Sequence, residues 1–179
     1  MFEELRMSIG LVATRFLFRN TRETVISFTE AISGARQALL IMPFNHREFL
    51  PTIRVIETIK KMIREEHITV ITDELGLEAV RMLPRSHFIR VVQTDLNAVY
   101  LPHTSIIHRV REKQYDLAVD LNLDLVLPSA YICRASDARV RVGFVRKRAE
   151  GFYNLQIKPD LTLGKQLIYD RLAQCLQMF

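Results

Sequence analysis

Residues 38–72, ALLIMPFNHREFLPTIRVIETIKKMIREEHITVIT, contain the pattern that decides the fold. The continuous apolar run at 38–44 is typical of a strand that is buried on both faces. A polar loop at 45–51 follows, and apolar residues between 55 and 63 then recur at helical spacing. The run at 67–72 predicts a second strand. A strand, a helix and another strand in this order indicate a unit with two parallel strands joined by a crossover helix.

The same alternation continues toward the C-terminus. We expect further strands at 88–92, 116–121, 139–144 and 152–157, and helices at 54–64, 75–83, 104–113 and 125–136. The predicted fold class is therefore α/β: a single Rossmann-like domain whose mostly parallel sheet has helices on both faces. Ligands of such folds bind beyond the carboxyl ends of the strands. The loops to inspect are 45–51, 72–75, 93–103, 121–127 and 144–151.

Two helical segments flank this alternation. Residues 1–37 predict an N-terminal helical extension, and residues 38–179 the Rossmann-like domain that ends in an amphipathic helix. The extension carries one apolar stripe, formed by Leu5, Ile9, Val12 and Phe16. This stripe could pack on its own domain or on a second copy of the chain, so a homodimer or another protein partner stays open. A membrane-surface role is disfavoured because the helix lacks a basic polar face.

The composition is that of an ordinary folded protein. The 179 residues are 49% apolar and 25% charged, which is enough for a core without disulfides or metals. No run of 18 apolar residues predicts a transmembrane helix, and residues 1–10 are charged where a secretory signal needs an apolar core. Cys133 and Cys175 form no CxxC pair and suit a reducing compartment. We therefore predict a cytoplasmic location.

Positive charge is concentrated in one segment. Residues 134–150 hold six of the arginines and lysines and two acidic residues, while the whole chain has a net charge of +5. Such a local patch favours a phosphorylated sugar or another acidic ligand, and Arg141 and Arg146 are its candidate contacts. A solvated loop is the alternative. A nucleic-acid-associated role for residues 134–148 is disfavoured, because no nucleic-acid-binding motif is present and few aromatic residues interleave the basic ones.

Several familiar catalytic and binding signatures do not occur in the sequence. There is no GxGxxG, no phosphate-binding GxxxxGK[ST], no HExxH and no GxSxG. The five histidines form no metal-binding pattern. We predict neither a cofactor nor a metal site.

Two short polar segments at predicted strand ends could form a site. The first loop holds Asn45, His46, Arg47 and Glu48, and a carboxylate in this place could serve as a general base. A solvated polar loop is the alternative. The fourth strand ends at Asp120-Leu-Asn122-Leu-Asp124, whose spacing lacks the remainder of a calcium loop. Polar groups that line a cleft, Asn122 among them, or that cap the next helix are the better interpretation.

Three segments together resemble a known family. The runs YDLAVDLN at 115–122, PSA at 128–130 and ARVRVG at 138–143 are similar to the N-terminal half of the family 9 glycosyltransferases, the bacterial ADP-heptose:lipopolysaccharide heptosyltransferases. The resemblance spans residues 38 to about 157. The chain is also similar to short single-domain proteins of Bacteroidetes-type bacteria.

The resemblance implies one half of a GT-B fold, the half that holds the acceptor sugar in lipopolysaccharide biosynthesis. It also implies a metal-independent inverting reaction, with Glu48 in the place of the catalytic base and Ser129 in the place of the helix serine. The chain departs from the family pattern, since Arg47 replaces a glycine, and Asn122 and Leu123 replace a Gln-Gly turn. The donor-binding domain has no counterpart in these 179 residues.

Three functions follow as hypotheses. The first is a stand-alone, non-catalytic binding or assembly module of heptosyltransferase type. The second is a subunit of a transferase that uses Glu48 as its base and takes the donor domain from another chain. The third is the nucleic-acid-associated protein considered above.

Overall fold

The computed structural model describes residues 2–19, 25–73 and 77–179. In chain order the elements are α1 (Phe2–Phe18), α2 (Phe28–Ser33), β1 (Ala38–Ile41), α3 (Phe49–Met62), β2 (Ile68–Thr72), α4 (Leu77–Met82), β3 (His87–Arg90), α5 (Thr104–Arg111), β4 (Leu117–Asp120), α6 (Leu127–Ala135), β5 (Val140–Phe144), β6 (Leu155–Ile157) and α7 (Lys165–Gln177). Short 3-10 turns at His46–Glu48, Glu65–His67 and Gln93–Asp95 join some of them.

The six strands form one parallel sheet in the order β3-β2-β1-β4-β5-β6. The prediction of a Rossmann-like α/β domain is therefore confirmed. The central strand β1 pairs with β2 on one side and with β4 on the other, so that Leu40 lies opposite both Val70 and Val119. The winding direction reverses between β1 and β4, and this is where such a sheet opens a crevice at its carboxyl edge.

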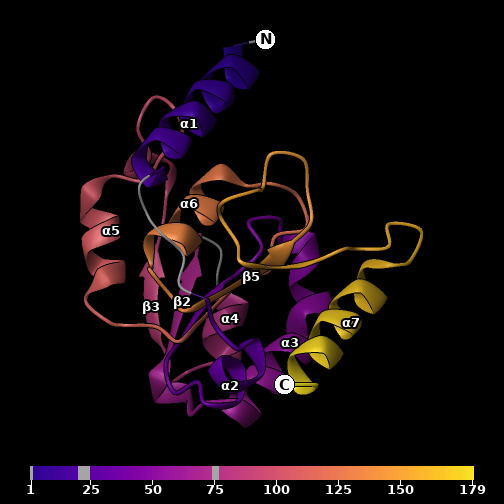
Figure 1. The fold of residues 1–179 in the computed structure, drawn as a ribbon. Coiled ribbons are helices and arrows are strands. Elements are labelled where there is room, and N and C mark those ends of the chain that lie inside the picture. Colours follow the sequence, from indigo (N-terminus) through magenta and orange to yellow (C-terminus); the bar gives the residue numbers. More distant parts are fainter. Residues whose placement is uncertain (1, 20–24, 74–76) are drawn as a thin grey trace.

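Helices cover both faces of the sheet (Figure 1). Helices α2, α3, α4 and α7 share one core with alternate strand residues such as Leu40, and α7 lies along α3. Helices α1, α5 and α6 share the other core with Leu39 and Ile41. Both faces of the central strands are thus buried, which explains why their sequences read as continuous apolar runs.

Most element boundaries fall close to the predicted ones. The strand predicted at 152–157 shortens to Leu155–Ile157, because Phe152 and Tyr153 turn into the core on the α6 side of the sheet. The helix predicted at 75–83 is observed from Leu77, and its first two predicted positions lie outside the described residues.

The helix α1 docks through a face that the sequence pattern did not indicate. Gly10, Leu11 and Thr14 are buried against the domain. The predicted apolar stripe, from Leu5 to Phe16, is exposed instead. The sequence left two packing partners open for that stripe, its own domain and a second copy of the chain. The structure excludes its own domain. The short helix α2 buries Ala31 and Ile32 in the main core.

Candidate functional site

The carboxyl ends of β1 and β4 are joined by the side chain of Asn122. Its Oδ1 accepts a hydrogen bond from the backbone N–H of Phe44 at 2.9 Å. Its Nδ2 donates to the carbonyl oxygen of Met42 at 3.3 Å and to Oδ1 of Asp120 at 2.8 Å. Asn122 is buried, so this amide fixes the path of the chain that leaves β1 at the point where the sheet changes its winding direction.

Asp120 is a fully buried carboxylate with several donors around it. Ser129 Oγ donates at 2.9 Å, the Tyr153 hydroxyl at 2.6 Å and the Asn122 N–H at 3.0 Å. Burial raises the pKa of the Tyr153 hydroxyl, and the neighbouring Asp120 raises it further. The tyrosine therefore stays a proton donor. Since a buried charge needs such compensation, the network stabilises the switch point.

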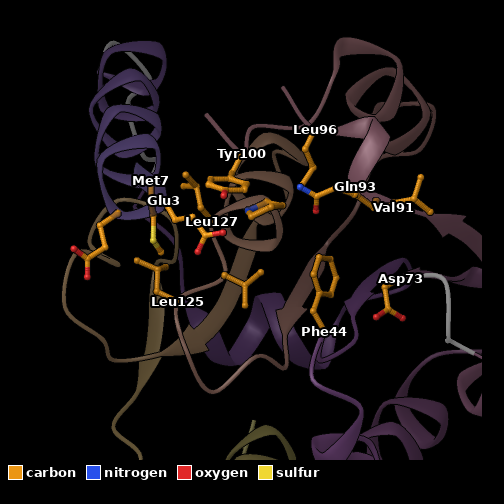
Figure 2. A pocket seen from close by; sticks show the side chains of 14 residues that line it. Glu3, Met7, Phe44, Asp73, Val91, Gln93, Leu96, Tyr100, Leu125 and Leu127 are labelled. Atoms are coloured by element: carbon orange, nitrogen blue, oxygen red, sulfur yellow. The ribbon is translucent and has the colours of Figure 1, made fainter. Parts of the chain in front are cut away.

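A pocket of about 720 Å³ opens beside this network (Figure 2). Its walls come from the ends of β1, β2 and β3, from the segment before α6 and from the first turns of α1. The lining residues are Glu3, Glu4, Met7, Phe44, Asp73, Val91, Val92, Gln93, Leu96, Tyr100, Leu125, Val126, Leu127 and Pro128. Figure 2 shows Phe44, Gln93 and Tyr100 around a common space. A pocket of this size can hold a small ligand.

The polar groups of this pocket are acidic or neutral. Glu3, Glu4 and Asp73 bring carboxylates, and Gln93 brings an amide. Within the described lining there is no lysine, arginine or histidine. Apolar side chains make up the remainder, so the pocket combines a largely apolar wall with a few hydrogen-bonding groups.

Local hydrogen bonds hold the loop that carries Tyr100. Oδ1 of Asn97 accepts from the N–H groups of Val99 and Leu101, both at 3.0 Å. Tyr100 itself has a φ of 62°. Its ring lies 4.4 Å from the guanidinium carbon of Arg6, and Arg6 Nε donates to the carbonyl oxygen of Ala98 at 2.5 Å. Arg6 thus ties α1 to the opposite wall of the pocket.

Glu48 lies apart from this pocket, beneath α7. Its side chain is 5% exposed, and its Oε1 is 2.8 Å from Nζ of Lys165. The Tyr169 hydroxyl is 3.3 Å from Oε2 of Glu48 and 2.6 Å from the carbonyl oxygen of Leu121, to which it donates. Burial raises the pKa of Tyr169, and the charge of Glu48 adds to this. A general base must reach the proton it removes, and here α7 covers the carboxylate.

The other predicted contacts are dispersed. Asn45 and Arg47 are exposed on the first loop, where Nδ2 of Asn45 donates to Oε1 of Glu48 at 3.4 Å. The side chain of His46 lies outside what the structure describes. Asn122 and Ser129 belong to the Asp120 network.

The basic segment at 134–148 also divides between the interior and the surface. Arg141 is buried, and its guanidinium donates to the carbonyl oxygens of Phe152 and Ala138. Arg146 donates to the carbonyl oxygen of Asp124 at 2.6 Å and lies over the ring of Phe144. Arg134 is buried as well, whereas Lys147 and Arg148 are exposed.

A search of solved structures relates this architecture to a known one. The crystal structure of the glycosyl transferase family 9 protein from Veillonella parvula DSM 2008 superposes with a TM-score of 0.61 at 17% identity. The chain has the fold of a family 9 glycosyltransferase domain. The match covers 79% of this chain and 41% of that chain, so our chain spans less than half of that protein. No family model and no curated protein matches the sequence.

The strand order of the sheet explains where the pocket lies better than any sequence motif does, because the pocket is beside the switch point between β1 and β4. Its lining comes from three of the predicted loops, 72–75, 93–103 and 121–127, together with residues that follow β1 and β3, the first turn of α6 and the N-terminal turns of α1. The sequence pointed to those loops as part of a binding site only through their position at the ends of predicted strands. Nothing in the sequence indicated that Glu3 and Glu4 would line the pocket, because their place in its wall depends on how α1 docks.

Within the described residues there is neither a metal-binding cluster nor a membrane-spanning helix. No group of three or more histidine, cysteine, aspartate or glutamate residues is arranged to hold a metal ion. No helix in that part of the chain combines the length and apolar character needed to cross a membrane.

Proposed function

We propose that this chain is a sugar-binding module with a family 9 glycosyltransferase fold and that it does not catalyse sugar transfer by itself. The observation that carries the proposal is the pocket at the carboxyl edge of the sheet. Its carboxylates and amide can accept and donate hydrogen bonds to hydroxyl groups, and Phe44 and Tyr100 offer apolar faces.

The charge of the pocket favours a neutral sugar. Three carboxylates line it, and they would repel a phosphate group. The phosphorylated sugar expected from the basic segment would have to bind elsewhere, and Arg141, the buried arginine of that segment, already donates to backbone carbonyls. A hydroxyl-rich acceptor without a phosphate is therefore the preferred ligand.

The position of Glu48 supports a non-catalytic role. The carboxylate is ion-paired with Lys165 and covered by α7, and it does not line the pocket. A base so placed has no access to a hydroxyl group of a ligand in that pocket.

The more specific parts of the proposal rest on the family resemblance. The sugar would be of the heptose type found in lipopolysaccharide, and the protein would act in the bacterial cytoplasm. Sugar transfer would need a donor-binding domain in addition to this domain, because the match covers 41% of the family 9 structure.

One observation favours a second function, the transferase subunit. Glu48 lies in the 3-10 turn between β1 and α3, in the loop after the carboxyl end of β1, where such folds bind their ligands. Lys165 is half exposed, so a movement of the first turn of α7 would release the carboxylate.

Calorimetric titration with three ligand groups separates these functions. The groups are neutral heptoses and hexoses, the same sugars as phosphates, and ADP-sugars. We expect a neutral sugar to bind, and Tyr100→Ala and Gln93→Ala to weaken its binding about tenfold, because each removes a group that lines the pocket. Glu48→Gln is the matched control outside the pocket and should bind as the wild type does.

Other results would decide against the module. Loss of sugar binding in Glu48→Gln, or release of ADP from an ADP-sugar by the wild-type chain that this variant lacks, would favour the transferase. Failure of every sugar to bind would refute a sugar site in this pocket.

A further inference from the structure

The helix α1 exposes a continuous apolar face. Phe2, Leu5, Ile9, Val12 and Phe16 are each half or more exposed. These five residues, which we call the α1 stripe, recur at spacings of three and four and so follow one line along the helix. Together with the neighbouring Leu17 they present about 600 Å² of apolar surface, which matches the largest patch found on a typical monomer.

The stripe faces away from the rest of the molecule. Successive residues of an α-helix are about 100° apart around its axis, which places Ile9 nearly opposite Thr14. Thr14, Leu11 and Gly10 are the buried residues of α1. A second helix can therefore pack on the stripe without meeting the domain that α1 already contacts.

We propose that the α1 stripes of two copies of this chain pack against each other in antiparallel orientation, with Ile9 at the twofold axis. Pairing two such faces would bury at most about 1,200 Å², the lower end of the range for specific interfaces. Around this axis Phe2 of one copy lies opposite Phe16 of the other, because the two positions are equally far from Ile9.

The charges at the two ends of α1 favour the antiparallel orientation. The first turn is acidic, with Glu3 and Glu4, and the last turn is basic, with Arg15. In an antiparallel pair the acidic end of each helix lies at the basic end of the second copy, whereas a parallel pair brings like ends together. Glu4 and Arg15 lie to the side of the stripe, about 100–120° from its centre, so this attraction acts between helix ends and not through a direct ion pair.

This distribution of charge suits a second copy better than a lipid surface. An interfacial helix keeps a basic polar face toward solvent, whereas the face of α1 opposite the stripe is buried on its own domain. The acidic pair Glu3 and Glu4 stands at one end of the stripe, where an anionic membrane would repel it.

Sedimentation of the full chain across micromolar concentrations tests the proposal. The wild type should pass from monomer to dimer as concentration rises. Ile9→Asp should weaken the dimer at least tenfold, because each copy then places a charge in the apolar contact. Leu161→Asp, at an exposed leucine in the loop before α7, is the matched control and should not change the equilibrium.

A charge exchange tests the orientation. Glu4→Arg alone should weaken the dimer at low salt, since it adds a positive charge to the acidic end that lies at the basic end of the second copy, and adding Arg15→Glu should restore the dimer. A double variant as weak as the single one would refute the antiparallel pair. A wild type that stays monomeric throughout, or a dimer unaffected by Ile9→Asp, would overturn the proposal. So would monomers that bind anionic phosphatidylserine vesicles through the stripe.

Discussion

At the level of single residues, the buried carboxylate of Asp120 is the group on which the switch point depends. Tyr153, from the loop between β5 and β6, donates to it at 2.6 Å, and the tyrosine ring covers Gly143 on β5. A Cβ on Gly143 would come within 2.7 Å of that ring. The glycine therefore allows the ring of Tyr153 to cross β5 and its hydroxyl to reach the carboxylate of Asp120 on the neighbouring strand β4.

Tyr153→Phe should lower the free energy of unfolding by about 1–3 kcal/mol at neutral pH. The substitution leaves a buried carboxylate with one donor fewer and changes little else in the packing. Urea denaturation followed by circular dichroism measures the change. Tyr100→Phe, at the half-exposed pocket rim, is the control and should change stability much less. Equal losses in both variants would show that the hydrogen bond to Asp120 contributes little.

The same variant should respond differently to alkaline pH. The pKa of Tyr153 is raised in the folded state above its ordinary value of 10.0, mainly by burial and then by Asp120. Its contribution is therefore complete below pH 10 and is lost as pH rises above that value, because the unfolded chain releases the proton first. Wild-type stability should fall more steeply than that of Tyr153→Phe between pH 10 and 11. Parallel pH profiles would contradict this.

The hydrogen-bond and ion-pair partners of single residues were the hardest feature to infer from the sequence. Glu48 was predicted as a base from its place after the first strand, but its ion pair comes from Lys165, 117 positions later. Asp120 and Asn122 were identified as polar groups at a strand end, because that position follows from a local pattern. Whether such a group faces a ligand or an internal donor depends on long-range packing, which a single sequence does not display.

At the level of elements, the contact of α1 with the domain depends on Gly10. A Cβ there would overlap the carbonyl oxygen of Val99 and lie 2.7 Å from Cδ2 of Leu127. The helix therefore approaches the backbone of the loop that forms the pocket more closely than any larger residue would permit. This glycine sits mid-helix, where it costs about 0.5–1 kcal/mol relative to alanine, and the close approach offsets that cost.

Gly10→Ala should destabilise the protein by about 1–3 kcal/mol despite the better helix propensity of alanine, because α1 must move away from Val99. Thermal unfolding measures the change. Gly164→Ala is the control without a steric clash, since no heavy atom lies within 4 Å of a Cβ at Gly164. Gly164 is the N-cap of α7, so this substitution should cost about 0.5–1 kcal/mol through the N-cap preference for glycine over alanine. An increase in Tm for Gly10→Ala would show that α1 does not depend on this contact.

Elements were predictable wherever one periodic pattern decided them. The apolar runs that became β2 and β4 were identified within one residue at each end, the usual precision for element ends. The run at 38–44 became a strand that ends three residues earlier, at Ile41, and the helix predicted at 54–64 begins five residues earlier, at Phe49. The docking face of α1 was not predictable. Its buried residues, Gly10, Leu11 and Thr14, include a glycine and a threonine, so hydrophobic spacing pointed to the other face.

At the level of the whole molecule, the sheet separates two layers that differ in how firmly they are held. On one face α3 and α7 pack along each other and close the core that contains Leu40. On the other face α1 is an outer element, attached through one side and through Arg6. The comparison with the family 9 structure covers 79% of the chain and supports the shared fold.

This difference predicts the order of native-state hydrogen exchange. The amides of α1 should exchange through local detachment at a free energy well below that of global unfolding, because few of its side chains are buried. The amides of β1 and β4, whose residues are fully buried, should exchange only by global unfolding, and those of α7 should be intermediate. Mass spectrometry of Ile9→Asp gives this order without a contribution from self-association. Protection of α1 equal to that of β1 would mean that the pocket wall is as rigid as the sheet, and that a ligand enters without displacing α1.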